Sequence, residues 1–475
     1  MYDTKQQEIL IVGAGPAGLF AALSLASGGY DVAVVDAGPD IEERYVEARS
    51  WTAAGAEHPD YEAGVGGAGL FSDGKLCLSL DVGGHLEHSL EASERQRLLS
   101  QIRQVFYSLS GGALKESTPT SDDLRRAARD AEARGLDFKY YPVAHIGTDR
   151  CAAMIAGLRQ LLDNLGVEFV VNSELVDLHL RQGGGFEATF LAEGREVRLS
   201  AEHVLLAMGK VGADRQAALC RGLGVGLEEQ PLYLGVRFET EAEDLESLFW
   251  ATKDPKYSVS LADGSKVKTH CASERGEVIE LRYNGLPLAG GHNFSFARSS
   301  RSGFSVLWNG FKAADSGYES ASGIMAKTKA ITDGRLLVQR LSDYLVGRAT
   351  SPADLKGIDL TCEGAHPGDL RQVLPAQFFE HMDLLLTRID GLAPTFGDNA
   401  VIYGPAIEWW MERVAVESRY MATSIPGLSV CGDGSGWSQG IVHAAATGLL
   451  AAEGIAESEL SLPVPSLQQP AFAGV

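Results

Sequence analysis

The chain has 475 residues, of which 45% are hydrophobic and 22% charged, as in ordinary folded proteins. Because this length exceeds what one simple core needs, we expect two domains, or one domain with a large insertion. The formal net charge of −22 at pH 7 repels nucleic-acid phosphates and anionic membrane surfaces. We therefore expect neither nucleic acid nor a membrane as a partner.

The cysteines are scattered along the chain and form no CxxC pair: Cys77, Cys151, Cys220, Cys271, Cys362 and Cys431. The first residues lack the basic segment and apolar stretch of a secretory signal, and no apolar run is long enough for a membrane span. We therefore expect a cytoplasmic protein with reduced cysteines and no metal site.

A glycine-rich turn follows the first apolar run of the chain. Residues 8–12 predict a strand, and a GxGxxG pattern at 13–18 leads from it into a helical segment. In dinucleotide sites such glycines make the turn, admit a pyrophosphate and let the helix pack on the strand. A second apolar run at 32–35 ends in Asp36, close to where an acidic residue binds a ribose hydroxyl. This order predicts a βαβ dinucleotide site, with FAD and NAD both open at this point.

The segments that follow are predicted from their apolar spacing and turn residues. A glycine-rich loop at 64–76 is a second candidate cofactor loop. The elements expected after it are helices at 93–109, 121–134 and 149–165, strands at 167–171, 174–181, 186–192, 196–199 and 204–208, hairpins between 232 and 307 with turns at 262–264, 274–276 and 284–285, helices at 319–345 and 370–391, a strand at 427–431, a loop at 432–436 and a helix at 440–457.

The last strand, loop and helix favour FAD over NAD. A nicotinamide dehydrogenase needs only the first βαβ unit, whereas the longer FAD needs a second site for its ribityl chain and ring system. At this point the sequence resembles the two-domain FAD-dependent oxidoreductases of the glutathione-reductase-like superfamily, and within it a branch of FAD-dependent dehydrogenases. The matching motifs lie at 13–18, 66–76, 207–209, 235–237, 403–405, 432–434 and 440–442. The chain departs from that branch at Leu70, at Gln439 and in the segment 269–276.

The resemblance implies an α/β fold with a Rossmann-like FAD-binding domain, a parallel sheet with helices, interleaved with a β-rich α+β substrate domain. The FAD-binding domain would comprise 1–80, 140–230 and 395–465, with a helical insertion at 81–139 and the substrate domain at 231–394. The cofactor-binding residues implied are Gly13, Ala14, Gly15, Pro16, Ala17, Gly18, Asp36, Ala37, Arg44, Gly67, Ala68, Gly69, Ser72, Asp73, Lys75, Val176, Ala207, Gly209, Gly432, Asp433, Gly440 and Ile441.

Each of those residues has an expected role in holding FAD. Asp36 and Arg44 would lie at the adenosine end, and Val176 would offer its backbone to the adenine. Asp433 would bind a hydroxyl of the ribityl or phosphate-linked part. The helix near Gly440 would direct its N-terminus at the flavin pyrimidine ring and stabilise the reduced anion.

Three side chains are candidates for proton transfer, which a dehydrogenation needs unless the leaving proton is already acidic. His270 lies on an expected strand of the substrate domain, and either faces a substrate or is a hydrogen-bonded core histidine. Glu408 is either a base or half of a structural ion pair. His443, one turn into the last helix, either reaches the flavin or packs behind it. Of the adjacent Trp409 and Trp410, at least one is expected in the core or an interface.

These features predict an FAD-dependent dehydrogenase that takes hydride from a small organic substrate, forming C=C or C=N, with dioxygen or another acceptor restoring the flavin. An NAD(P)H-dependent reductase of an unsaturated molecule is the alternative, with NAD(P)H docking transiently because no second nucleotide motif follows. An RNA-associated flavoprotein is a third hypothesis, which the net charge disfavours. The substrate and the oligomeric state are not predicted.

Overall fold

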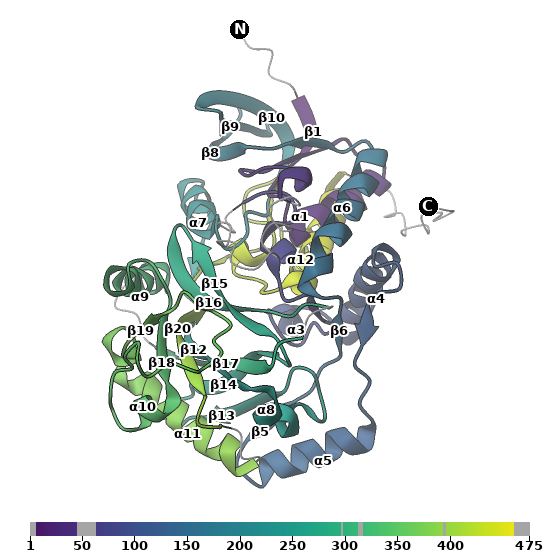
Figure 1. Ribbon diagram of the computed structural model, residues 1–475. Helices are drawn as coiled ribbons and strands as arrows, with labels where there is room; N and C mark the ends of the chain where they lie inside the picture. The colour runs from purple at the N-terminus through teal and green to yellow at the C-terminus, as the bar shows by residue number, and fades with distance from the viewer. Residues whose placement is uncertain (1–5, 45–62, 296–297, 312–316, 393–395, 460–475) are drawn as a thin grey trace.

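The computed structural model describes residues 6–44, 63–295, 298–311, 317–392 and 396–459. They form two large sheets, one at the top and one at the bottom of Figure 1, with helices α1 and α12 in the region between. No helix within these ranges is long and apolar enough to cross a membrane.

The first sheet holds the dinucleotide motif. Its strand order is β7 (Glu168–Val170), β2 (Val32–Val35), β1 (Gln6–Val12), β10 (Arg195–Leu206), β9 (Phe186–Ala192) and β8 (Ser173–Leu180), and β22 (Leu428–Val430) also pairs with β10. β1 is parallel to β2 and β10, and β22 is parallel to β10. The C-terminal strand therefore lies in the same sheet as the N-terminal one, which brings the two predicted cofactor segments together.

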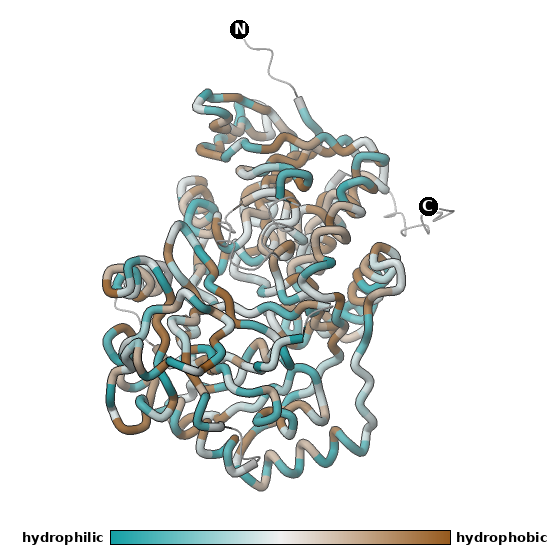
Figure 2. The backbone as a smooth tube through the Cα atoms, in the orientation of Figure 1, coloured by the Kyte–Doolittle hydropathy of each residue, from teal (hydrophilic) through white to brown (hydrophobic). Residues whose placement is uncertain are grey.

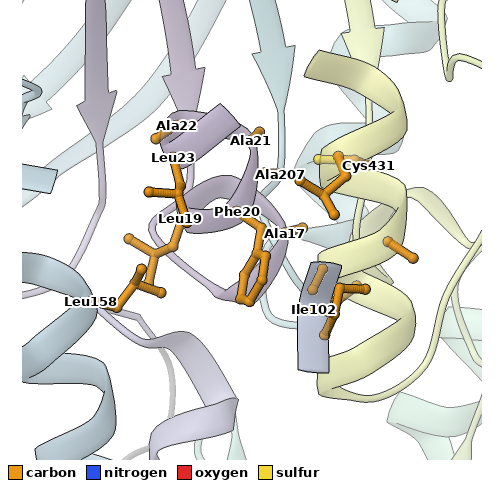
Figure 3. Close-up of a cluster of buried hydrophobic side chains, with 14 of the residues drawn as sticks. Ala17, Leu19, Phe20, Ala21, Ala22, Leu23, Ile102, Leu158, Ala207 and Cys431 are labelled. Carbon is orange, nitrogen blue, oxygen red and sulfur yellow. The ribbon is translucent and has the colours of Figure 1, made fainter. Parts of the chain in front are cut away.

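Four helices pack beside this sheet around one apolar core: α1 (Pro16–Ser27), α4 (Ala92–Leu109), α6 (Thr148–Asn164) and α12 (Ile441–Glu459). Figure 3 shows part of this core, with side chains from α1 facing Ile102 of α4 and Leu158 of α6. The rings of Phe20 and Phe106 lie 5.2 Å apart in it. Because α1 is apolar on nearly all sides, it is buried between the sheet and its neighbours.

The second sheet has the order β19 (His366–Pro367), β18 (Leu337–Arg340), β20 (Val401–Glu408), β12 (Leu232–Glu241), β17 (Arg301–Phe311), β14 (Lys266–Ser273), β13 (Lys256–Ser260) and β5 (Asp137–Lys139). α11 (Ala376–Leu392) and α8 (Ala242–Phe249) pack against it, and α5 (Ser121–Glu132), which is largely hydrophilic (Figure 2), packs against its edge strand β5.

The smaller elements complete the chain. They are η1 (Gly67–Phe71), β3 (Lys75–Cys77), α3 (Leu86–Ser89), β4 (Lys115–Glu116), β6 (Val143–His145), α7 (Ala213–Gly222), β11 (Leu227–Glu228), β15 (Glu277–Tyr283), β16 (Leu286–His292), α9 (Gly317–Thr332), α10 (Leu341–Leu345), η2 (Leu370–Gln372), β21 (Arg413–Val414) and η3 (Asp433–Ser435). The hairpins β13–β14 and β15–β16 turn at the predicted 262–264 and 284–285.

The structure differs from the sequence-based expectation at several elements. β5 lies within the expected helical insertion 81–139 but is a strand of the second sheet, because it pairs with β13. β20 pairs with β12, so residues 401–408 belong to the second sheet and not to the FAD-binding domain expected to resume at 395. The expected strands 196–199 and 204–208 are one continuous strand, β10, because its two halves pair with different neighbours. β18 interrupts the expected helix 319–345, since its residues pair with β20.

Candidate functional site

A cavity of about 1120 Å³ extends from the glycine turn after β1 to the second sheet. The turn, the loop at η1, the start of α12 and one face of the second sheet all line it. Elements far apart in sequence thus enclose one site, as the motif pattern predicted.

The three glycines of the GxGxxG turn differ in what an added Cβ would meet. A Cβ on Gly13 would lie 2.2 Å from the Ala207 carbonyl oxygen, and one on Gly18 would lie 1.9 Å from the Gly13 carbonyl oxygen. These two glycines therefore allow backbone segments to touch. A Cβ on Gly15 would have Gly67 Cα, at 4.0 Å, as its nearest neighbour. A side chain at position 15 would therefore clash with no described protein atom, and the residue lines the cavity.

The loop at η1 lies directly against this turn. A Cβ on Gly67 would lie 3.0 Å from Gly15 Cα, and one on Gly69 would lie 3.1 Å from Pro16 Cγ and 3.5 Å from Ile441 Cγ1. The structure therefore brings together the three cofactor segments that are widely separated in sequence.

Asp36 is buried at the end of β2 and lines the cavity. Its carboxylate accepts hydrogen bonds from the backbone amides of Ala14, Gly38 and Gly64, at 2.7, 2.9 and 2.7 Å. The residue thus holds the turn and the loop that precedes η1 in one conformation, in addition to the ribose role expected from sequence.

Arg44 and Val176 do not line the cavity, which differs from their expected roles. Arg44 is buried, donates to the carbonyl oxygens of Gly64 and Val65, each at 2.9 Å, and stacks over Phe71. It braces the glycine loop from behind. Val176 is 37% exposed at a bulge of β8, and the preceding residues of that strand, 173–175, line the cavity instead.

The remaining cofactor candidates fall into two groups. Those that line the cavity are Pro16, Ala17, Ala37, Ala68, Ser72, Ala207, Gly209, Gly432, Gly440 and Ile441. Ala14 and Gly18 act in the packing of the turn, through the Asp36 contact and the close approach to Gly13 respectively.

Asp433 begins η3 and lies close to the N-terminus of α12. It accepts hydrogen bonds from Ser438 Oγ at 2.9 Å and from the Gly440 amide at 3.2 Å. Burial raises the pKa of this carboxyl to about 6, although Lys210 opposes the shift. Residues 439–442 at the start of α12 line the cavity, so the positive end of the helix dipole lies beside that space. The first turn of α12 holds no acidic residue that would offset it.

Lys75 connects the glycine loop to the second sheet. Its ammonium donates to the Ala272 carbonyl oxygen at 2.7 Å and lies 3.0 Å from Asp73 and 3.9 Å from Asp254. Burial would lower the pKa of Lys75, but Asp254 and Asp73 together raise it above the ordinary value. Tyr141 donates to Asp254 as well. Lys75 and Asp73 therefore fix the junction between the two sheets.

All three candidates for proton transfer line the cavity, but their surroundings differ. Glu408 is held by Lys210, 2.5 Å away, and by the Gln439 amide, so it is half of an ion pair. His443 is buried behind Gly84, whose Cβ would lie 2.1 Å from the imidazole Cδ2, and burial lowers its pKa to about 4. His270 lies on the cavity side of β14. Burial, and then the charge of Lys256, lower the pKa of His270 well below its ordinary value, so the ring stays neutral.

The structure adds basic and aromatic residues that sequence reasoning did not single out. Lys266 and Lys268 precede His270 at every second position of β14 and line the cavity, while Val267 and Thr269 between them are buried on the other face. This alternation is visible in the sequence and is typical of a strand with one polar face. Trp409 lines the cavity, whereas Trp410 belongs to the core.

Comparisons with known proteins bear on the first half of the chain. Residues 8–237 match the DAO family, described as FAD dependent oxidoreductase. An uncharacterized protein of Clostridium beijerinckii is 28% identical over 236 residues, which are 49% of this chain and 36% of that protein. The chain thus spans little more than a third of the length of this relative.

Two solved structures resemble the chain over almost its full length. Glycine oxidase from Geobacillus kaustophilus has a TM-score of 0.41 and 14% identity, covering 99% of this chain and 100% of that one. Aklavinone-11 hydroxylase in a complex with FAD and aklavinone has a TM-score of 0.38 and 14% identity, covering 97% and 63%.

The family match covers residues 8–237, just under half of the chain, and FAD is the cofactor that the description of that family names. The cavity fits this cofactor in two respects. Gly15 leaves open a place that a Cβ would fill, beside the N-terminus of α1, and the half-buried Asp433 presents its carboxyl to the cavity just before α12.

Proposed function

We propose that the protein is an FAD-dependent dehydrogenase that oxidises a small organic molecule. One observation carries the proposal. A single cavity joins the glycine turn to the face of the second sheet that bears His270. A substrate on that sheet face would therefore lie in the same enclosed space as the cofactor. The six cysteines are unpaired in the structure, which supports a cytoplasmic location.

FAD, when bound, supplies the acceptor for the hydride that leaves the substrate carbon. The N-terminal turn and Asp36 would hold its adenosine and pyrophosphate end, and Asp433 and the start of α12 its ribityl and flavin end. These residues would orient the cofactor along the cavity.

His270 is the proposed proton acceptor. Its neutral imidazole has one ring nitrogen with an electron pair, which a protonated ring would lack. The ring lies on the cavity wall, and the Lys256 ammonium, which can only donate, lies 3.5 Å from Nδ1. Nδ1 therefore bears the electron pair, and it would take the substrate proton in place of this long hydrogen bond. Glu408 is not proposed for this role, because Lys210 and Gln439 already occupy its carboxylate.

The test is anaerobic mixing of the purified, FAD-loaded protein with candidate substrates, followed at the absorbance bands of the flavin. The proposal expects at least one small organic molecule to bleach the flavin without NAD(P)H. Bleaching by NADH or NADPH alone would reject dehydrogenation and establish the reverse reaction, a nicotinamide-driven reduction of an unsaturated substrate.

A further inference from the structure

The cavity face of the second sheet carries more positive charge than its carboxylates balance. Four of the lysines that line the cavity have a carboxylate partner. These pairs are Lys75 with Asp73 at 3.0 Å, Lys210 with Glu408 at 2.5 Å, Lys256 with Asp254 at 3.4 Å and Lys139 with Glu87 at 4.0 Å.

Lys268 and Arg237 also line the cavity and have no such partner among the described residues. The Lys268 ammonium lies 4.1 Å from the centre of the Tyr233 ring, a contact that leaves its charge uncompensated. Burial, followed by the charge of Lys256, lowers the pKa of Lys268 to about 7.

Arg237 is 1% exposed and donates only to neutral oxygens: the Cys271 carbonyl at 3.1 Å, Ser305 Oγ at 3.3 Å and Ser273 Oγ at 2.9 Å. A charge without a counter-ion is costly where water is largely excluded. The buried Arg237 stays charged, whereas the half-buried Lys268 is about half protonated at neutral pH, and an anion beside it would favour its charged form.

Strand register places these groups on one patch. Ser305 of β17 is opposite both Arg237 of β12 and His270 of β14. Lys268 points to the same face as His270, because residues two apart on a strand share a face, and the two Cα atoms are about 7 Å apart. An anion at Lys268 would thus lie next to His270. Arg237 lies on the same face, with the single strand β17 between it and His270.

We propose, on the basis of the proposed function, that the substrate carries an oxyanion, a carboxylate or a phosphate, which binds the Lys268 ammonium on this sheet face. Arg237 is a positioning residue, since it is too buried to touch a ligand and acts through its charge. Binding at Lys268 leaves the part of the substrate about 7 Å away beside His270, where its proton is removed. The substrate anion also offsets the lysine charges that keep His270 from accepting a proton.

Anion binding to the oxidised holoenzyme tests this proposal without turnover. Acetate, inorganic phosphate and the neutral acetamide are titrated by calorimetry at constant ionic strength, with the flavin absorbance recorded in parallel. We expect acetate or phosphate to bind and acetamide not to bind. Lys268→Met should raise the Kd about 10- to 100-fold, the value of one charge-assisted hydrogen bond, and Lys268→Arg should restore most of the affinity. Lys327→Met, which removes an exposed lysine of α9, should leave the Kd unchanged.

Binding of acetate would indicate a carboxylate substrate, and binding of inorganic phosphate would indicate a phosphate substrate. The proposal is overturned if neither anion binds to the wild-type protein, or if Lys268→Met binds it equally well. It is also overturned if Lys268→Met lowers the reduction potential of the flavin while the Kd for the anion is unchanged. The Lys268 charge would then stabilise the reduced cofactor and not bind a substrate. A failure of dehydrogenation would appear separately, as a flavin that no organic substrate bleaches although anions bind.

Discussion

Replacement of Gly15 by alanine separates cofactor binding from folding. Gly15 has φ −76° and ψ −179°, which any residue adopts, and the added Cβ would meet no described atom closer than Gly67 Cα at 4.0 Å. The free energy of unfolding of the apoprotein should therefore change by no more than about 1 kcal/mol. The same methyl group would stand where the backbone approaches the pyrophosphate. Loss of one charge-assisted hydrogen bond there raises the Kd for FAD about 10- to 100-fold.

The assay is removal of FAD, thermal unfolding of the apoprotein and titration with FAD followed by quenching of its fluorescence. Gly222→Ala is the matched control, because its Cβ also meets nothing within 4 Å, φ is not positive, and the residue lies at the end of α7 outside the cavity. Gly13→Ala should instead disrupt the fold, since its Cβ would lie 2.2 Å from the Ala207 carbonyl oxygen. A Gly15→Ala protein that binds FAD with wild-type affinity would refute the assigned site.

Three further predictions concern the charged groups of the cavity. His270→Gln should retain FAD but lower the anaerobic rate of flavin reduction about 10²- to 10⁴-fold, measured by stopped flow, and an unchanged rate would remove His270 as the proton acceptor. Glu408→Gln should leave that rate unchanged while lowering the Tm through loss of the Lys210 pair, whereas a rate loss like that of His270→Gln would restore Glu408 as the base. Asp254 is buried, which by itself would raise its pKa, but Lys256 and then Lys75 lower it to about 2. Because this folded value lies below the unfolded value of about 3.9, the Asp254 contribution of about 2 kcal/mol is present above pH 4 and is lost as the pH falls toward 2. Asp254→Asn should therefore lower the Tm at pH 7 and lower it much less near pH 2, and a Tm difference that is constant with pH would contradict this account.

The cofactor half of the site follows from sequence because each signal is local. The turn at 13–18, its strands and Asp36 are contiguous, so spacing alone orders them. The role of Asp36 in binding three backbone amides was missed, since two of its partners, Gly38 and Gly64, belong to loops with no regular pattern. Arg44 gave no sign of being buried, because its partners are carbonyl oxygens of that same irregular loop.

The substrate half depends on long-range strand pairing, which local spacing does not report. The position of β20 between β18 and β12 could not be read from residues 401–408, whose apolar run suits either sheet. The alternation of Lys266, Lys268 and His270 with Val267 and Thr269 was present in the sequence. That alternation does not by itself predict a basic patch. Ser305 joins these residues through the pairing of β14 with β17, and Arg237 joins them through the pairing of β17 with β12.

The central claim is that an organic substrate in this cavity gives its hydride to FAD. The most direct measurement is the anaerobic absorbance of the oxidised flavin during mixing with a panel of small organic acids, their neutral amides, and NADH and NADPH. The account predicts bleaching by at least one acid, none by its amide, and no requirement for a nicotinamide nucleotide. A flavin that every organic substrate leaves oxidised and that only NADH or NADPH bleaches would contradict it.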